Sequence, residues 1–368
     1  MVSIRIRAFV LAYSIVGPTI LALFDKDSLL TEYLLALTVL LAIISSIQKF
    51  SRERRLLGLF LAALFFTAIF FKATLNSYFA VPHIDFLVII PGVIFGFLYN
   101  TSELGHISDD LVNFAPKWML LLLVLTITAS DEALYSIGEY GYYSIGLLGS
   151  FGGVLSLLKI TKSAAPERLT FLIYILFFIL TMISGHRTSI LSLFFCSSIL
   201  ISARYGLLRL FLSFILLSAV SWYIFLYQLL NVDYLVSKLI GIGSADFDDY
   251  SSGRASIWSA VINNWSEIGL FPVDPIAAYE NFGGMHSISL DLILGFGIFG
   301  FLISVWFYGG ILLFRRKFNT LGILLIYGAS NLTLTGWYLI EPVFWLTCGI
   351  LIYETKEKIT RSRYQSIS

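Results

Sequence analysis

Long apolar runs alternate with short polar intervals along almost the whole chain. Each run is rich enough in Leu, Ile, Phe and Val to predict a membrane-crossing helix, although several are shorter than the roughly 20 residues that a crossing needs and must draw on their flanks. The twelve runs are 8–24, 30–47, 56–71, 86–99, 118–129, 142–158, 169–183, 190–203, 210–230, 288–314, 321–335 and 337–353. The pattern predicts an all-α integral membrane protein with about twelve transmembrane helices, forming one membrane domain over residues 1–368.

The distribution of basic residues supports this order of segments. Lysine and arginine are retained preferentially on the cytoplasmic side of a membrane. If the N-terminus lies inside and the twelve segments alternate, nineteen of the 24 lysines and arginines fall on the inner side. The outer side receives only Lys26, Lys72, Arg187, Lys238 and Arg254. We therefore expect both termini in the cytoplasm and the interval 231–285 on the outer side.

One inner interval departs from the charge pattern. Residues 100–117 carry Glu103, Asp109 and Asp110 but a single lysine, Lys117. Acidic residues contribute little to orientation, so the interval is expected to be an inner loop between the fourth and fifth segments.

Composition excludes an ordinary soluble domain, because 58% of the residues are hydrophobic and only 13% are charged. A net charge of +1 gives no indication of a nucleic-acid partner. Cys196 and Cys348 lie inside apolar segments, so we expect two buried thiols and no disulfide. No cluster of His, Cys and Asp suggests a metal site.

The interval 231–285 is much longer than any other polar interval, and long loops in compact proteins are usually functional or disordered. Within it, residues 256–268 have helical apolar periodicity, which predicts a short amphipathic helix at the membrane surface. Its apolar face is made by Ile257, Val261, Trp265 and Ile268.

Two of the outer arginines are candidate binding residues. Arg187 follows the seventh segment in a turn of about six residues and must lie near the membrane surface, where it is either a snorkelling side chain or part of a functional site. Arg254 follows Gly253 at the start of the amphipathic helix, and it is either a solvated loop cation or a second member of the same site. Two guanidinium groups at one surface suit a diphosphate, because each binds phosphate oxygens bidentately.

His286 opens the tenth segment. If the helix is continuous, Leu290, Gly297 and Gly300 lie within about 40° of His286 and Asp291 lies about 140° away, so the histidine and the aspartate do not form a dyad. A neutral imidazole here is either an ordinary interface residue or a general base.

The sequence motifs at these three places resemble those of the integral-membrane O-antigen polymerase and O-antigen ligase superfamily. The first is Gly-His-Arg-Thr-Ser around Arg187, and the second is Ser-Gly-Arg-x-x-Ile-Trp around Arg254. The third is His286 with the spacing that leads to Leu290, Gly297 and Gly300. Ser287 stands where the family pattern has asparagine.

The resemblance implies a glycosyltransferase of the GT-C type in the bacterial inner membrane, with one long periplasmic loop between the ninth and tenth spans. Its donor would be an oligosaccharide on undecaprenyl diphosphate, its other partners would be membrane lipids and a chain-length regulator, and no cofactor is implied. The catalytic residues would be Arg187 and Arg254, which bind the diphosphate, and His286, which removes a proton from the acceptor hydroxyl or orients it. Further substrate contacts would come from Trp258, Trp265 and Tyr279.

Three functions remain open at this point. A repeat-unit polymerase joins the glycan to another lipid-linked unit, whereas a ligase joins it to lipid A-core. The polymerase is favoured because polymerases are the more numerous and divergent group. The alternative from another class is a flippase for the same lipid-linked unit, which is disfavoured because the polar residues gather on one outer face and no internal repeat is evident.

Overall fold

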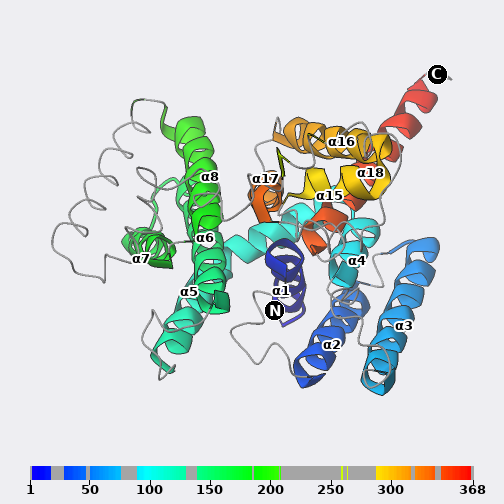
Figure 1. The fold of residues 1–368 in the computed structure, drawn as a ribbon, viewed down its shortest axis with the longest axis horizontal. Coiled ribbons are helices and arrows are strands. Elements are labelled where there is room, and N and C mark those ends of the chain that lie inside the picture. The colour runs from blue at the N-terminus through cyan, green and yellow to red at the C-terminus, as the bar shows by residue number, and fades with distance from the viewer. Residues whose placement is uncertain are drawn as a thin grey trace. The chain divides into compact units, whose positions relative to one another are not determined.

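The computed structural model describes residues 2–17, 29–46, 50–75, 89–129, 139–184, 186–206, 287–315, 320–335 and 341–365, together with Leu208, Trp258, Ser259 and Asn263. All twelve regular elements among these residues are helices, so the all-α prediction is confirmed for this part of the chain (Figure 1). The chain divides into two compact units. The prediction of one membrane domain stays a prediction.

The first unit comprises residues 1–113, 302–332 and 336–368. Its helix α1 packs against α2, α4 and α18, and these four helices form its centre (Figure 1). The elements of this unit are α1 (Val2–Val16), α2 (Leu29–Ser46), α3 (Arg52–Leu75), α4 (Ile90–Leu98), the start of α5 (Thr101–Ala129), most of α16 (Ile298–Arg315) and α17 (Thr320–Thr335), and α18 (Pro342–Gln365).

Helices α4 and α18 cross with their backbones in direct contact. A Cβ atom added at Gly96 would lie 2.8 Å from the carbonyl oxygen of Leu346, and one added at Gly349 would lie 2.5 Å from the carbonyl carbon of Gly96. Side chains larger than glycine therefore do not fit at this crossing. Small residues of this kind allow apolar helices to approach closely without any polar contact.

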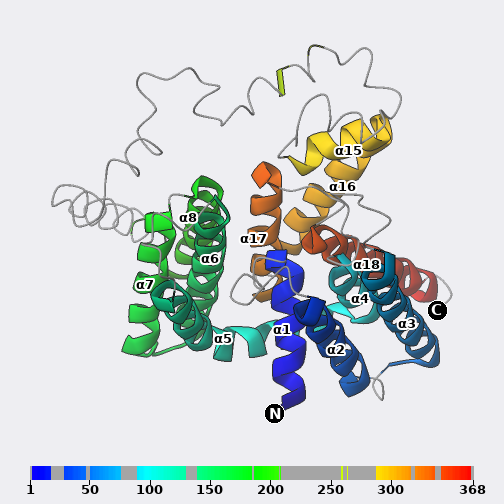
Figure 2. The same ribbon diagram turned by 60° about the horizontal axis from the view of Figure 1, so that its bottom comes forward.

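The second unit comprises residues 114–301 and 333–335. Its main bundle is formed by α6 (Glu139–Lys162), α7 (Arg168–Ser184) and α8 (Arg187–Tyr205), drawn in green in Figures 1 and 2. Both α7 and α8 pack on α6, whose residues 145–158 are all buried. The unit also contains the second part of α5, the nine-residue helix α15 (Ile288–Phe296) and the first turn of α16.

The outward faces of several helices are apolar. On α2, Leu34, Leu37, Leu41 and Ile44 lie on one face and are 53, 47, 41 and 50% exposed. Similar exposed apolar side chains occur on α3, α7, α8 and α16. Among the described helices, two stretches are by length and composition able to cross a membrane: Ile145–Lys162 of α6 and the whole of α8, Arg187–Tyr205.

Most predicted segments correspond to helices. Segments 142–158, 169–183 and 190–203 lie within α6, α7 and α8. Segment 210–230 lies outside the described residues, as does most of the interval 231–285. Trp258, Ser259 and Asn263 are helical, but the amphipathic helix around them stays a prediction.

The inner interval 100–117 is helical rather than a loop. Helix α5 begins at Thr101 and continues for 29 residues, with Pro116 in its interior. Asn100 and Glu103 form a reciprocal cap, since the Asn100 N–H donates to the Glu103 carboxylate at 2.9 Å and the Glu103 N–H donates to Asn100 Oδ1 at 2.7 Å. This capping box satisfies two backbone donors and starts the helix.

The tenth predicted segment, 288–314, is not one continuous helix. It breaks at Gly297, whose φ of 58° and ψ of −134° suit glycine and strain other residues. A Cβ atom at Gly300 would lie 1.8 Å from the carbonyl oxygen of Leu292, so the first turn of α16 lies directly on α15. The predicted common face of Leu290, Gly297 and Gly300 is therefore wrong, because residues on either side of the break do not share one helical axis.

Candidate functional site at the turn between α7 and α8

Of the six predicted site residues, the structure describes Arg187 and Trp258. Both side chains are half-buried, and Trp258 is in a helical conformation. The remaining four, Arg254, Trp265, Tyr279 and His286, lie outside the described residues. Their convergence with Arg187 stays a prediction.

Arg187 is the first residue of α8. Helix α7 ends at Ser184, and His186 stands at the N-cap of α8 with an extended backbone conformation (φ −74°, ψ 97°). The connection between the two helices is therefore only two residues long, which holds Arg187 at the end of a tightly packed helical pair.

His186 is the centre of a buried polar cluster beside Arg187. Its side chain is only 7% exposed, and its Nδ1 lies 2.6 Å from the hydroxyl oxygen of Ser189, one turn into α8. The His186 backbone N–H donates to Ser184 Oγ at 3.2 Å, and the Ser184 hydroxyl donates to the carbonyl oxygen of Thr181 at 2.7 Å. These bonds connect the last turn of α7 to the first turn of α8.

Helix α6 fixes this turn from the other side. A Cβ atom added at Gly146 would lie 2.6 Å from His186 Cβ and 2.7 Å from Ser184 Oγ, well inside normal contact distance. Only glycine at position 146 leaves room for the turn. The position of Arg187 is thus determined by glycine on one helix and by polar contacts on two others.

Sequence reasoning missed His186 and Gly146 as positioning residues. His186 forms its contact with the hydroxyl of Ser189, and a serine three residues away gives no distinctive signal in the sequence. A signal was present in α6, where Gly146, Gly149 and Gly153 recur at helical spacing and provide a surface for close packing.

This arrangement is suited to an anion. The backbone N–H groups in the first turn of an α-helix have no acceptor within the helix, and that end of the helix carries partial positive charge. A guanidinium group at the same place adds a full charge with a planar pair of donors. A phosphate group is the natural ligand for such a combination.

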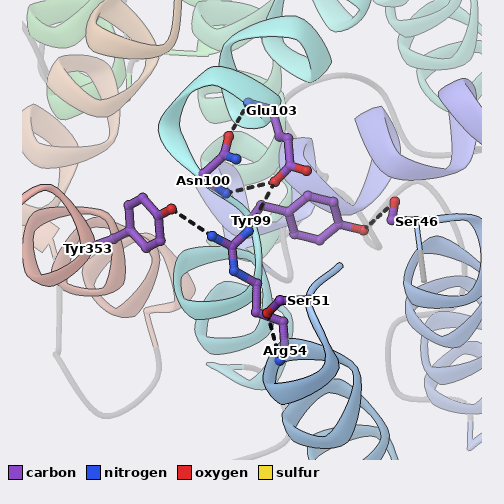
Figure 3. A network of polar contacts seen from close by, with 7 residues as sticks. All are labelled: Ser46, Ser51, Arg54, Tyr99, Asn100, Glu103 and Tyr353. Atoms are coloured by element: carbon purple, nitrogen blue, oxygen red, sulfur yellow. Dashed lines mark hydrogen bonds and ion pairs between the residues drawn. The ribbon is translucent and has the colours of Figure 1, made fainter. Parts of the chain in front are cut away.

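A second polar network lies in the first unit, around Arg54 (Figure 3). The guanidinium group of Arg54 lies 3.7 Å from the carboxylate of Glu103 and donates to the hydroxyl of Tyr353 at 2.6 Å. The Tyr99 hydroxyl donates to Ser46 Oγ at 3.1 Å. These contacts join the ends of α2, α3, α4 and α5 to the middle of α18.

The other acidic residues near this end are also engaged. The Thr101 hydroxyl donates to the Glu354 carboxylate at 2.6 Å, and the Thr320 hydroxyl donates to the carboxylate of Asp109. We interpret the Arg54 network and these bonds as structural, because their donors and acceptors satisfy one another.

Metal-binding groups do not gather in the described part of the chain. No three His, Cys, Asp or Glu residues there lie close enough to hold a metal ion. The absence of a metal from the full site stays a prediction. Cys196 and Cys348 are both buried and carry free thiols, as predicted.

Comparison of the chain with protein-family models, with curated proteins and with solved structures finds no match.

Proposed function

We propose that this chain is a membrane-embedded glycosyltransferase that polymerises the repeat units of O-antigen or a related surface polysaccharide. It transfers glycan from undecaprenyl diphosphate to a lipid-linked repeat unit at the periplasmic face of a bacterial inner membrane. The observation that carries the proposal is the setting of Arg187, a half-buried cation at the N-terminus of apolar α8, held by the buried His186 cluster.

Membrane insertion is supported by the apolar outer faces of the helices. Soluble monomers rarely expose contiguous apolar patches larger than a few hundred Å². In α2, the whole face formed by Leu34, Leu37, Leu41 and Ile44 is exposed, and α7 adds Phe171, Leu172 and Leu176 at 54, 51 and 39%. Lipid is the solvent in which such faces are stable.

The proposed topology is supported by the partners of the polar side chains. Arg54, Glu103 and Tyr353 all belong to the predicted inner ends of their segments, and Arg54 contacts both of the others. In the second unit, Lys117 and Glu167, 3.8 Å apart, also belong to inner intervals. A miscounted span between these residues would put interacting side chains on opposite sides of the membrane.

At the outer side, the proposed mechanism uses two arginines to bind the donor and a histidine to act on the acceptor. Arg187 and Arg254 bind the two phosphates of the donor and stabilise the charge that develops on the diphosphate as the glycosidic bond breaks. His286 removes a proton from the acceptor hydroxyl or orients that hydroxyl. Diphosphate is a good leaving group, so no general acid is required. Trp258, Trp265 and Tyr279 contact the sugars or anchor the outer interval at the interface.

The break at Gly297 is the feature that most resembles a transporter, since transporters often bind substrate at interrupted helices. Such interruptions lie near the bilayer midplane, however. Helix α16 has 18 residues after the break and is about 27 Å long, which is nearly the thickness of the hydrocarbon core. The break then falls at the outer end of the span, which favours the enzyme over the flippase.

Replacing Arg187 tests the proposal. The glycan ladder made by cells whose only copy is Arg187→Ala is expected to fall at least about 100-fold, the usual effect of removing one donor to a developing anion. Arg187→Lys restores the charge without the planar fork and is expected to recover only part of the activity.

The matched control is Arg204→Ala, which removes an exposed arginine from the last turn of the same helix. This variant is expected to make a normal ladder. All three variants are compared at equal amounts of membrane-inserted protein. A full ladder from Arg187→Ala would remove the basis of the proposal.

A further inference from the structure

Helix α15 is a separate element at the outer end of the tenth segment. In the proposed topology, α16 runs from Ile298 to Arg315 and is followed by further basic residues on the inner side. The 18 residues of α16, about 27 Å long, are nearly sufficient to cross the hydrocarbon core. The nine residues of α15 add only about 13 Å and fold back at Gly297, so they belong to the outer face rather than to the span.

Helix α15 is tightly packed on one face. Ile288 and Leu292 are 0 and 1% exposed, and Gly300 at the start of α16 lies against the backbone of Leu292. By contrast, Phe296 and Phe299 on either side of the bend are 41 and 69% exposed, which suits contact with lipid. The geometry of α15 is therefore fixed by its packing on one side and by the bend on the other.

Asp291 is the exceptional residue of this helix. Its Oδ2 atom is buried, and the structure describes no hydrogen-bond donor that contacts it. A buried carboxylate oxygen without a partner is costly, because ionisation without compensating hydrogen bonds is strongly unfavourable in apolar surroundings. Unsatisfied groups of this kind are rare in native proteins, and the handling of a ligand or a proton is one reason for them.

We propose that Asp291 is the general base of the glycosyl transfer, with the hydroxyl of the acceptor sugar as its absent partner. This inference rests on the proposed function. The acceptor oxygen forms a bond to the anomeric carbon of the donor, and the bond between that carbon and the diphosphate oxygen breaks. The diphosphate keeps the electron pair of the broken bond and leaves while still attached to the lipid carrier. The hydroxyl proton passes to Asp291 Oδ2.

This assignment changes the role of His286. The histidine lies five residues before Asp291 and immediately before Ser287, the N-cap of α15. With a carboxylate as proton acceptor, His286 orients the acceptor hydroxyl and does not remove its proton. The acceptor then engages residues at the start of α15, whereas the donor diphosphate engages Arg187 at the start of α8.

Three substitutions at position 291 separate a catalytic role from a structural one. Asp291→Asn keeps the shape of the side chain but cannot take up the proton, and Asp291→Leu fills the site with apolar atoms. Both are expected to lower the polymerisation rate about 100-fold or more, the contribution typical of a general base. Their thermal unfolding midpoints are expected to stay equal or rise, because an unsatisfied carboxylate has been removed. Asp291→Glu retains a carboxylate and is expected to keep measurable activity.

The assay uses purified full-length protein in liposomes, with the undecaprenyl-diphosphate-linked unit extracted from cells that lack the gene. Asn and Leu variants with near-normal rates would overturn the inference. A fall in melting temperature that parallels the loss of rate would also overturn it, by assigning Asp291 a structural role. If Arg187→Ala is inactive in the same assay while Asp291→Asn is active, the proposed function stands and only the base assignment fails. If the wild-type protein itself makes no polymer, the proposed function fails.

Discussion

The substitution Gly146→Ala tests whether the buried turn between α7 and α8 controls activity. The added Cβ atom would meet His186 Cβ at 2.6 Å and Ser184 Oγ at 2.7 Å, whereas non-bonded carbon atoms are most stable at about 3.5–4.0 Å. The turn must therefore move by roughly 1 Å, and Arg187 moves with it. Overpacking of this kind costs about 1–3 kcal/mol of stability.

If the chain is the proposed polymerase, the expected effect on its rate is larger than the effect on stability. A displacement of about 1 Å in a substrate-positioning group can lower the rate about 100-fold. The assay is polymerisation of the lipid-linked unit in liposomes, with thermal unfolding in detergent measured on the same preparation. We expect a reduced rate from a protein that remains folded at the assay temperature.

Two glycine variants serve as controls. In Gly152→Ala the added atom would lie 2.4 Å from the ring of Phe177, so packing between α6 and α7 is disturbed to a similar degree about 9 Å away from Gly146 along α6. In Gly105→Ala nothing lies within 4 Å of the added atom. Equal losses of rate in Gly146→Ala and Gly152→Ala would refute the argument, because general destabilisation would then explain both.

Two further predictions concern the first unit and the charged pair in the second. Arg54→Ala removes one of the two partners of the one-quarter-exposed Glu103 carboxylate and also the hydrogen bond to Tyr353, so it is expected to lower stability by about 1 kcal/mol. The exposed Arg52→Ala is expected to have almost no effect. Melting in detergent compares the two variants, and equal midpoints would contradict the structural role of the network. Lys117→Ala breaks an ion pair whose side chains are 50 and 62% exposed, so its unfolding midpoint is expected to match that of the wild type, and a large drop would show that the pair is stabilising after all.

The positions of α6, α7 and α8 could be predicted from the sequence because each apolar run ends at polar or basic residues. The predicted segments 142–158, 169–183 and 190–203 fall short of the helix ends by only a few residues. Hydropathy detects the apolar part of a helix but not the polar turns that extend it.

The same limitation explains the error at α5. Residues 101–117 are polar enough to resemble a loop, yet they form helix because Asn100 and Glu103 cap the first turn and Glu103 and Asp109 find partners on other elements. The spacing of Asn100 and Glu103 was visible in the sequence. The contacts of Glu103 with Arg54 and of Asp109 with Thr320 were not visible, since these partners are distant along the chain.

The break at Gly297 could not be predicted from periodicity. Residues 288–314 are apolar throughout, and glycines are common in membrane helices, so the pattern gives no reason to separate α15 from α16. The backbone conformation of Gly297 alone separates the two helices. The sequence predicts Asp291 on a long helix, on the side opposite His286. In the structure, Asp291 lies on the short helix α15 and has an unsatisfied carboxylate oxygen.

The most direct test of the central claim is to delete the gene in its native host and to examine the surface polysaccharide on a gel together with the lipid-linked intermediates. The polymerase account predicts core carrying a single repeat unit, with the ladder of longer chains gone, and single units remaining on the lipid carrier at the periplasmic face. Bare core with long glycan accumulating on the carrier would contradict it in favour of a ligase. Loss of all outer glycan with single units trapped on the cytoplasmic side would contradict it in favour of a flippase.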